Sequence, residues 1–285
     1  MSDKNNPYKD ESNTGHVWDD NLRELTNKPP GWWTLGFHAS WIFVIAYTVL
    51  YPSWPMISGH TTGLLGWTSI KEYKQDLKEI EEIRAPYELK IAKMSAEEIL
   101  ADSDLSNYTV RSAKVLFGDF CSACHGGNGA GNLGFPVLAD DDWLYGGDID
   151  AIQTSITDGR SGAMPAFAST LSTQQLQDVS QHVVALGQGG QHEAGAAVFM
   201  EAGCFACHGM DATGIQAMGS ANLADAIYRF APGTLESVTY TVTHGINDAG
   251  DDKTRDATMP SFSERLTETD IKKLAVFVHK LGGGQ

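Results

Sequence analysis

Cys121-Ser122-Ala123-Cys124-His125 is the stretch that decides the fold, and Cys204-Phe205-Ala206-Cys207-His208 repeats its pattern later in the chain. On a helical turn, side chains three and four positions apart share a face, so the two thiols and the imidazole of each copy can meet one flat ligand. Two cysteines at this spacing can bond to the vinyl groups of a porphyrin as thioethers, while the following histidine ligates the iron. Each copy therefore predicts one c-type haem.

Cys-x-x-Cys alone is also typical of thioredoxin-like redox sites and of half a zinc site. Three observations favour haem. The histidine follows at once in both copies, the two pairs use all four cysteines, and a Met-Pro pair follows each copy, at Met164-Pro165 and Met259-Pro260. A zinc site would need four converging ligands, and nothing in the sequence pairs the cysteines in that way.

The predicted site residues fall into two sets. Covalent attachment is assigned to Cys121, Cys124, Cys204 and Cys207, and the axial iron ligands are His125, Met164, His208 and Met259. The alternative is that Met164 and Met259 are only core residues, but both recur at the same position of the repeated sequence. Histidine and methionine would together fill both axial positions, which predicts electron transfer and no catalytic residue. The sequence leaves open whether each methionine serves its own repeat or the other one.

Composition restricts the partners. The chain has 285 residues, 42% of them hydrophobic, and a formal net charge of -16. From residue 101 onward it carries 22 Asp or Glu against 10 Lys or Arg. This charge argues against nucleic-acid binding and suits a basic electron-donor cytochrome, although solubility alone explains it equally well.

An uncharged stretch of 20 residues runs from Trp32 to Tyr51 and has aromatic residues at both ends. That length spans a bilayer core of ~30 Å, so a transmembrane helix is expected. A buried soluble helix seldom runs this far without a charge. A cleaved signal peptide would start earlier, be shorter and end in a small-residue cleavage site.

The flanking charges predict the orientation of this span. Lys4, Lys9, Arg23 and Lys28 precede it, and no Lys or Arg follows until Lys71. The N-terminus should therefore stay in the cytoplasm, with the remainder exported. We expect a single-pass protein of the bacterial inner membrane with periplasmic haem domains. His38, inside the span, is expected to make a hydrogen bond in the membrane or near the headgroups.

The two haem motifs belong to a repeated unit. The methionine follows the histidine by 39 positions in the first copy and by 51 in the second. The second copy therefore has about 12 extra residues, which we expect in the polar loop Asn247–Thr258. Two interpretations of this loop remain open: an insertion without a function, and a surface that contacts a partner protein. Beyond each methionine an amphipathic run is expected to close its own domain. Its cap is expected at Ser172 or Thr173 in the first copy and at Thr267 or Thr269 in the second.

The predicted fold is mainly α, with one N-terminal transmembrane helix followed by two tandem class I-like cytochrome c domains. Residues 71–94 read as a solvated helix that breaks near Pro86. The segments are a cytoplasmic tail at 1–31, the membrane helix at 32–54, a periplasmic linker at 55–107, and cytochrome c domains at 108–190 and 191–285.

The order of these parts closely resembles the dihaem cytochrome c subunit (CcoP/FixP type, subunit III) of cbb3-type cytochrome c oxidases. The tail and span make the resemblance specific, since the haem motifs alone indicate only a cytochrome c. The stretches that carry it are His16-Val17-Trp18-Asp19-Asp20, Glu24-Leu25-Thr26-Asn27, Pro30-Gly31-Trp32-Trp33, Tyr51-Pro52-Ser53-Trp54-Pro55, Asp141-Asp142-Trp143-Leu144-Tyr145-Gly146-Gly147 and Gly159-Arg160.

The resemblance implies two haem c groups per chain and a role in passing electrons. They would come from a periplasmic donor cytochrome c, go to a monohaem subunit, and reach the catalytic subunit, where oxygen is reduced in a proton-pumping complex. Two alternatives remain open at this point. One is an independent membrane-tethered dihaem carrier, and the other is a dihaem peroxidase, which the two Met-Pro pairs disfavour.

Overall fold

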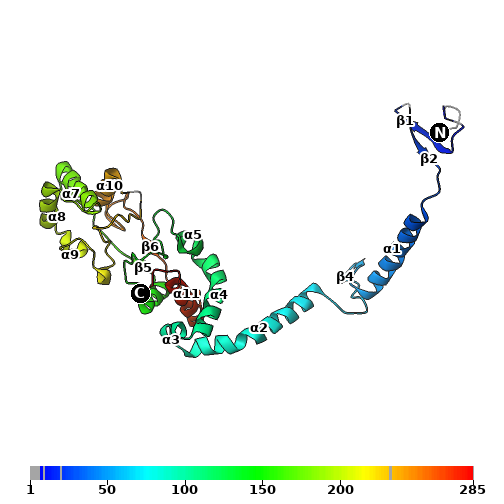
Figure 1. Cartoon of the computed structure of the whole chain (residues 1–285), viewed down its shortest axis with the longest axis horizontal. Coiled ribbons are helices and arrows are strands. Elements are labelled where there is room, and N and C mark those ends of the chain that lie inside the picture. Colours follow the sequence, from blue (N-terminus) through cyan, green and yellow to red (C-terminus); the bar gives the residue numbers. More distant parts are fainter. Residues whose placement is uncertain (1–6, 9, 20, 231–232, 285) are drawn as a thin grey trace. The chain divides into compact units, whose positions relative to one another are not determined.

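The computed structural model describes residues 7–8, 10–19, 21–230 and 233–284 (Figure 1). Three residues named in the sequence analysis lie outside the described residues: Lys4 and Lys9, whose charges favour a cytoplasmic N-terminus, and Asp20. The described chain is mainly helical, which confirms the predicted fold class. Its contacts divide it into two compact units, Met1–Ile83 and Arg84–Gln285, and each is described by itself.

The first unit begins with a β-hairpin that the sequence did not predict. Strands β1 (Asn13–Trp18) and β2 (Leu22–Leu25) are antiparallel, with Trp18 opposite Leu22. Burial alternates along β1, as it does on a strand with one covered face. Asp19 turns the chain with a positive φ of 47°, a conformation that Asp tolerates better than most residues.

Helix α1 (Gly31–Leu50) is the predicted span, and none of its residues is buried. Among the described residues it is the one helix long and apolar enough to cross a membrane. At ~1.5 Å per residue, 20 residues measure ~30 Å. The chain then folds back through β3 (Pro55–Met56) and β4 (Gly59–His60). The N–H groups of Leu64 and Leu65 donate to the carbonyls of Val49 and Leu50, which satisfies acceptors that the helix end leaves free.

Helix α2 (Ser69–Lys93) continues through Pro86, so the predicted break there is wrong. Proline removes the N–H that would bond the carbonyl of Glu82. Both residues are exposed, and water can bond that carbonyl instead. The helical segment therefore continues past Pro86 without this hydrogen bond.

The second unit contains the remaining elements, which are α3 (Ala96–Ala101), α4 (Ser103–Phe120), α5 (Ser122–His125), η2 (Gly127–Gly129), α6 (Ile149–Asp158), β5 (Arg160–Ser161), α7 (Thr173–Leu186), α8 (Glu193–Glu201), α9 (Phe205–His208), η3 (Gln216–Met218), α10 (Leu235–His244), β6 (Thr258–Met259) and α11 (Glu268–His279). Ser172 caps α7 and Thr267 caps α11. Each hydroxyl accepts from the N–H three residues on, as expected for these starts.

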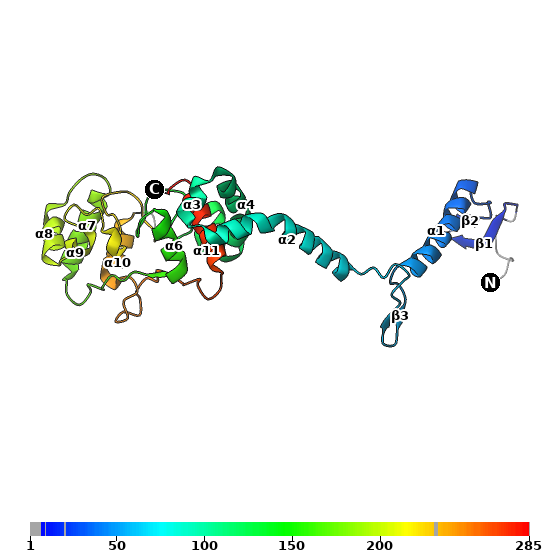
Figure 2. The ribbon, with the colours of Figure 1, turned by 90° about the horizontal axis from the view of Figure 1, so that it is seen from below.

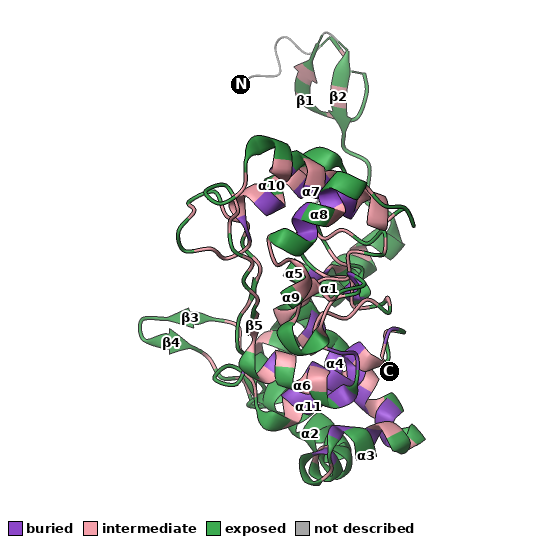
Figure 3. Ribbon diagram, turned by 90° about the vertical axis from the view of Figure 1, so that its left-hand side faces the viewer, coloured by how far each residue is buried: buried purple, intermediate pink, exposed green. Residues whose placement is uncertain are grey.

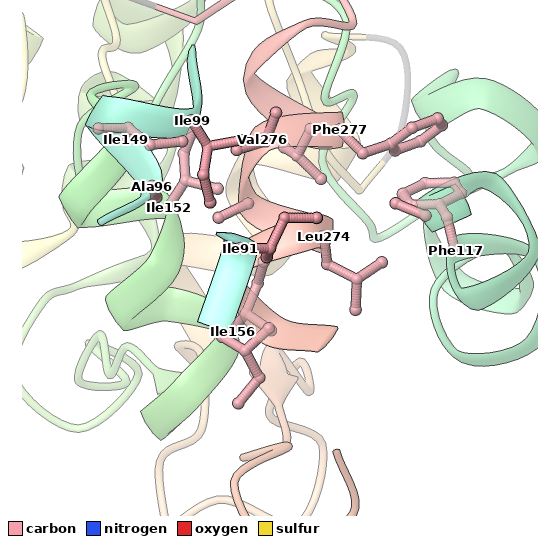
Figure 4. Packing of buried hydrophobic residues seen from close by; sticks show 14 of the residues in the cluster. Ile91, Ala96, Ile99, Phe117, Ile149, Ile152, Ile156, Leu274, Val276 and Phe277 are labelled. Atoms are coloured by element: carbon pink, nitrogen blue, oxygen red, sulfur yellow. The ribbon is translucent and has the colours of Figure 1, made fainter. Parts of the chain in front are cut away.

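Two hydrophobic cores hold this unit together. In the first core, α11 packs against α3, α4 and α6. Leu274 and Val276 of α11 are fully buried there, and the Phe117 and Phe277 rings lie 5.0 Å apart between centroids (Figure 4).

In the second core, α7 packs against α8 and α10, so these helices form a group separate from the first (Figure 2). Buried residues concentrate on the helix faces that meet inside each group (Figure 3). The second core consists of Leu176, Val179, Val183, Val198, Phe199, Ala212, Val238 and Val242.

The closing helices are exchanged between the repeats. Helix α7 follows the first haem motif but packs in the second core, whereas α11 follows the second motif and packs in the first. The expectation that each run closes its own domain is therefore wrong. Both runs are apolar at the same helical spacing, so the local pattern does not select the core that each helix joins.

Replacing Leu274 with alanine should lower the free energy of unfolding by about 2–5 kcal/mol, because it leaves a cavity in the first core. Val115→Ala is the matched control, since Val115 is 67% exposed on α4. Denaturant unfolding followed by circular dichroism measures both. Equal midpoints for the two variants would contradict the placement of α11 in this core.

Candidate haem sites

The first haem motif follows directly from α4. Leu105, Ala113 and Phe117 form the buried face of that helix, and Cys121 comes at its end, also packed on the first core. One further turn, α5, carries Cys124, which is exposed, and His125, which is buried. The amphipathic helix thus fixes where the motif begins.

His125 and His208 are held in the same way. Their Nδ1 atoms lie 3.1 Å from the Pro136 carbonyl oxygen and 2.9 Å from the Ala221 carbonyl oxygen, respectively. A carbonyl can only accept, so each Nδ1 carries the proton and each Nε2 keeps its lone pair. Metal-binding histidines are commonly oriented by such a bond from the other ring nitrogen.

Burial lowers the pKa of both histidines, because the charged imidazolium loses its hydration. Bonds to the two carbonyls oppose this effect only in part. Both rings therefore favour the neutral form, which is the form that binds a metal. The orienting carbonyls could not be found from the sequence.

None of the four motif cysteines takes part in a disulfide. Burial raises the pKa of Cys121 to about 11 and also raises the pKa of Cys204. Cys204 packs on the second core, as Cys121 does on the first. Neutral imidazoles, with two thiols of each motif nearby and in no disulfide, suit a covalently attached porphyrin.

The methionines lie on the opposite repeat. Met164 forms a reciprocal backbone pair with Ile246, at 2.9 Å in both directions, and its side chain packs on the second core. Met259 pairs with Arg160 between β5 and β6 and packs on the first core. Each methionine thus shares a core with the cysteine of the other repeat's motif.

In each repeat a glycine ends the helix that precedes the methionine. This glycine lets the chain pass close to the backbone of the other repeat's methionine. Gly159 ends α6 with φ 75°, and Gly245 ends α10 with φ 70°. A Cβ on Gly159 would overlap the Met259 carbonyl, and one on Gly245 would overlap the Met164 carbonyl. Of these residues, the sequence indicated only Gly159-Arg160, as part of the family resemblance.

Further contacts interlock the two repeats. Asp142 Oδ2 and Arg229 Nη2 form a largely buried ion pair at 2.7 Å, and the Gly134 N–H donates to the Arg229 carbonyl. Burial raises the pKa of Asp142, although Arg229 opposes that change. Trp143 Nε1 donates to the Gly283 carbonyl at 2.5 Å, which fixes the end of the chain beside the first repeat.

Four histidines outside the haem motifs make local contacts. His182 is buried in the second core, and its Nδ1 accepts from the His192 N–H at 3.3 Å. His192 caps α8 by accepting from the Gly195 N–H. His244 lies 2.9 Å from Asp251. In the first unit, His38 Nδ1 bonds the Thr34 carbonyl of its own helix at 2.7 Å.

Comparison with protein families gives three matches. Residues 10–58 match the N-terminal domain of cytochrome oxidase-cbb3, FixP; residues 109–183 match cytochrome c oxidase, cbb3-type, subunit III; and residues 192–282 match cytochrome c. These matches define the class as a c-type cytochrome with two cytochrome c domains. The exact domain boundaries proposed from the sequence stay predictions.

Relatives of known identity match along nearly the whole chain. The cbb3-type cytochrome c oxidase subunit FixP of Azorhizobium caulinodans is 38% identical over 287 residues, covering 96% of this chain and 94% of the relative. Subunit CcoP of Cereibacter sphaeroides is 37% identical, with 95% of each chain covered. Subunit FixPc of Rhizobium leguminosarum bv. viciae is 37% identical over the full length of both.

The chain therefore belongs to the FixP/CcoP family of cbb3-type cytochrome c oxidase subunits. It is an electron-transfer cytochrome subunit of that respiratory oxidase, which replaces the independent carrier and the peroxidase as alternatives. Its cytochrome c domains imply binding of c-type haem, and other oxidase subunits are its partners. Family membership and helix α1 together indicate membrane anchoring.

Proposed function

We propose that this chain carries two haem c groups, each ligated by residues from both repeats. Cys121, Cys124 and His125 would hold the first haem, with Met259 as its second axial ligand. The second haem would be held by Cys204, Cys207 and His208, with Met164. The reciprocal placement of the two methionines on opposite cores is the observation that carries this assignment.

Haem c, when bound, supplies an iron that takes up and releases one electron. The two histidines present oriented, neutral Nε2 atoms to it. The thioether sulfurs of Met164 and Met259 would complete the ligation of the two irons, exclude oxygen and peroxide, and favour ferrous iron because sulfur is a soft ligand. Pro165 and Pro260 restrict the backbone directly after each methionine, which helps to keep the sulfur in place.

The electrons would come from a periplasmic donor cytochrome c and pass to the monohaem subunit, and from there to the oxygen-reducing centre of the catalytic subunit. Family membership supports this route. The excess of Asp and Glu beyond residue 101 would attract a basic donor, at a rate that falls as salt concentration rises.

We place the chain in the bacterial inner membrane as a single-pass protein, with its N-terminus in the cytoplasm and its haem domains in the periplasm. Arg23 and Lys28 precede α1, and the next basic residue is Lys71. Basic residues near a span favour its cytoplasmic end. Attachment of c-type haem outside the bacterial membrane agrees with this orientation.

Purification of the tagged chain in mild detergent tests the proposed partners. An oxidase subunit should come out in constant ratio with a large membrane protein that contains haem b, seen in the reduced-minus-oxidised spectrum. The same tag on residues 84–285 alone is the comparison for the contribution of the anchor. Recovery of the full chain without haem b would contradict the assignment.

A further inference from the structure

The insertion Asn247–Thr258 makes side-chain hydrogen bonds to the chain segments around both methionines. We propose that Asn247 and Asp248 form a clamp on the extended segments that carry Met164 (residues 160–166) and Met259 (residues 257–262), here called the two methionine strands. Asn247 holds both strands, and Asp248 holds only that of Met164. The proposal rests on the proposed function, since it concerns methionines taken as iron ligands. It assigns Asn247 and Asp248 as positioning residues, because neither would touch the iron.

Asn247 lies where the two methionine strands cross. Its Nδ2 donates to the Gly162 carbonyl at 2.7 Å and to the Ala257 carbonyl at 3.2 Å, and its Oδ1 accepts from the Ala257 N–H at 3.0 Å. Gly162 is two residues before Met164, and Ala257 is two residues before Met259. One amide therefore ties together the segments that lead into both ligands.

Asp248 acts on one strand alone. Its Oδ2 accepts from the Ala166 N–H at 2.6 Å, and Ala166 is two residues after Met164. With Asn247 on Gly162, the Met164 strand is thus held on both sides of the ligand. A carboxylate acceptor makes such a bond stronger than a neutral one.

The loop behind the clamp is anchored to α10, which contributes Val238 and Val242 to the second core. Asp248 N–H donates to Thr254 Oγ1 at 3.0 Å, and Asn247 N–H donates to the Arg255 carbonyl at 2.8 Å. Arg255 in turn donates to Ser237 of α10. These bonds fix Asn247 and Asp248 against the repeat that carries His208.

The main-chain contacts of the two strands are otherwise alike. Phe167 N–H donates to the Val242 carbonyl at 3.1 Å, and Phe262 N–H donates to the Ile156 carbonyl at the same distance. The insertion adds side-chain bonds to this shared pattern. It compensates for the exchange, because each ligand must stay fixed to a haem held by the other repeat.

The test uses the haem-loaded full chain in detergent, with carbon monoxide binding to the ferrous form and the two midpoint potentials as readouts. Asn247→Gly removes the amide but keeps the left-handed backbone, where Asn247 has φ 48°. We expect carbon monoxide to bind roughly fivefold faster at the haem of Met164 and by a larger factor at the haem of Met259, because the variant loses one hydrogen bond on the Met164 side and two on the Met259 side. Both midpoint potentials should fall.

Asp248→Ala should change only the haem ligated by Met164. Asp252→Ala is the matched control, because Asp252 is an exposed carboxylate of the same loop and should leave both haems unchanged. Asn247→Asp retains the acceptor and the backbone tolerance while it loses both donated bonds. If Asn247→Gly folds poorly, Asn247→Asp takes its place, and it should also give faster carbon monoxide binding and lower midpoint potentials at both haems.

Wild-type binding and potentials in both Asn247 variants would overturn the clamp, as would an Asp248→Ala effect of equal size at both haems. Met164→Ala and Met259→Ala separate this failure from a failure of the proposed ligands. If they open haems while the Asn247 variants behave as wild type, only the clamp is wrong. If neither opens a haem, the ligand assignment fails and the clamp fails with it.

Discussion

Replacing Cys204 and Cys207 together with alanine should leave one covalently bound haem on the chain, a loss of about half the haem stain per chain. The thiols of one motif attach one porphyrin, and the other motif keeps its own pair. Cys121→Ala with Cys124→Ala should give the same loss. Haem staining and an absorbance haem count on purified protein measure it.

Ser122→Ala is the control for this experiment. It changes the first motif and removes a hydrogen bond from Ser122 Oγ to the Gly118 carbonyl, but it leaves both thiols in place. Its haem count should equal that of the wild type. A double-cysteine variant that still carries two covalent haems would show that the attachment residues are assigned wrongly.

Replacing Met164 or Met259 with alanine should keep both haems attached and open one iron to carbon monoxide, so that about half the ferrous haem binds it. The sulfur is removed, and alanine cannot reach the vacated axial position. The midpoint potential of that haem should also fall, because a soft ligand that favours ferrous iron is gone. Difference spectra and a redox titration provide the readouts.

Met210→Ala is matched to these variants in residue type, but Met210 is 72% exposed and does not pack on either core. It should bind no more carbon monoxide than the wild type. Carbon monoxide spectra that are unaltered in both Met164→Ala and Met259→Ala would count against these ligands.

The sequence predicted the local features well, because they depend on short spacings. The cap at Ser172, the apolar helix after Gly31 and the amphipathic face of α11 all follow from residues within a few turns of one another. The family resemblance added the order of the parts, which the comparisons confirm.

The features that the sequence missed depend on long-range pairing. Leu176 and Leu274 belong to equivalent amphipathic runs, and nothing near either one states which repeat it will join. The choice is made where the methionine strands cross, between residues nearly a hundred positions apart such as Arg160 and Met259. Pro86 was misread for a different reason, since an exposed helix can tolerate a missing N–H.

The exchange of methionines is tested most directly in a chain that keeps only the first haem, made by replacing Cys204 and Cys207 with alanine. In that background, Met259→Ala should make the ferrous haem bind carbon monoxide, and Met164→Ala should not. If Met164→Ala opens the haem and Met259→Ala leaves it closed, each repeat supplies its own ligand and the crossed assignment is wrong.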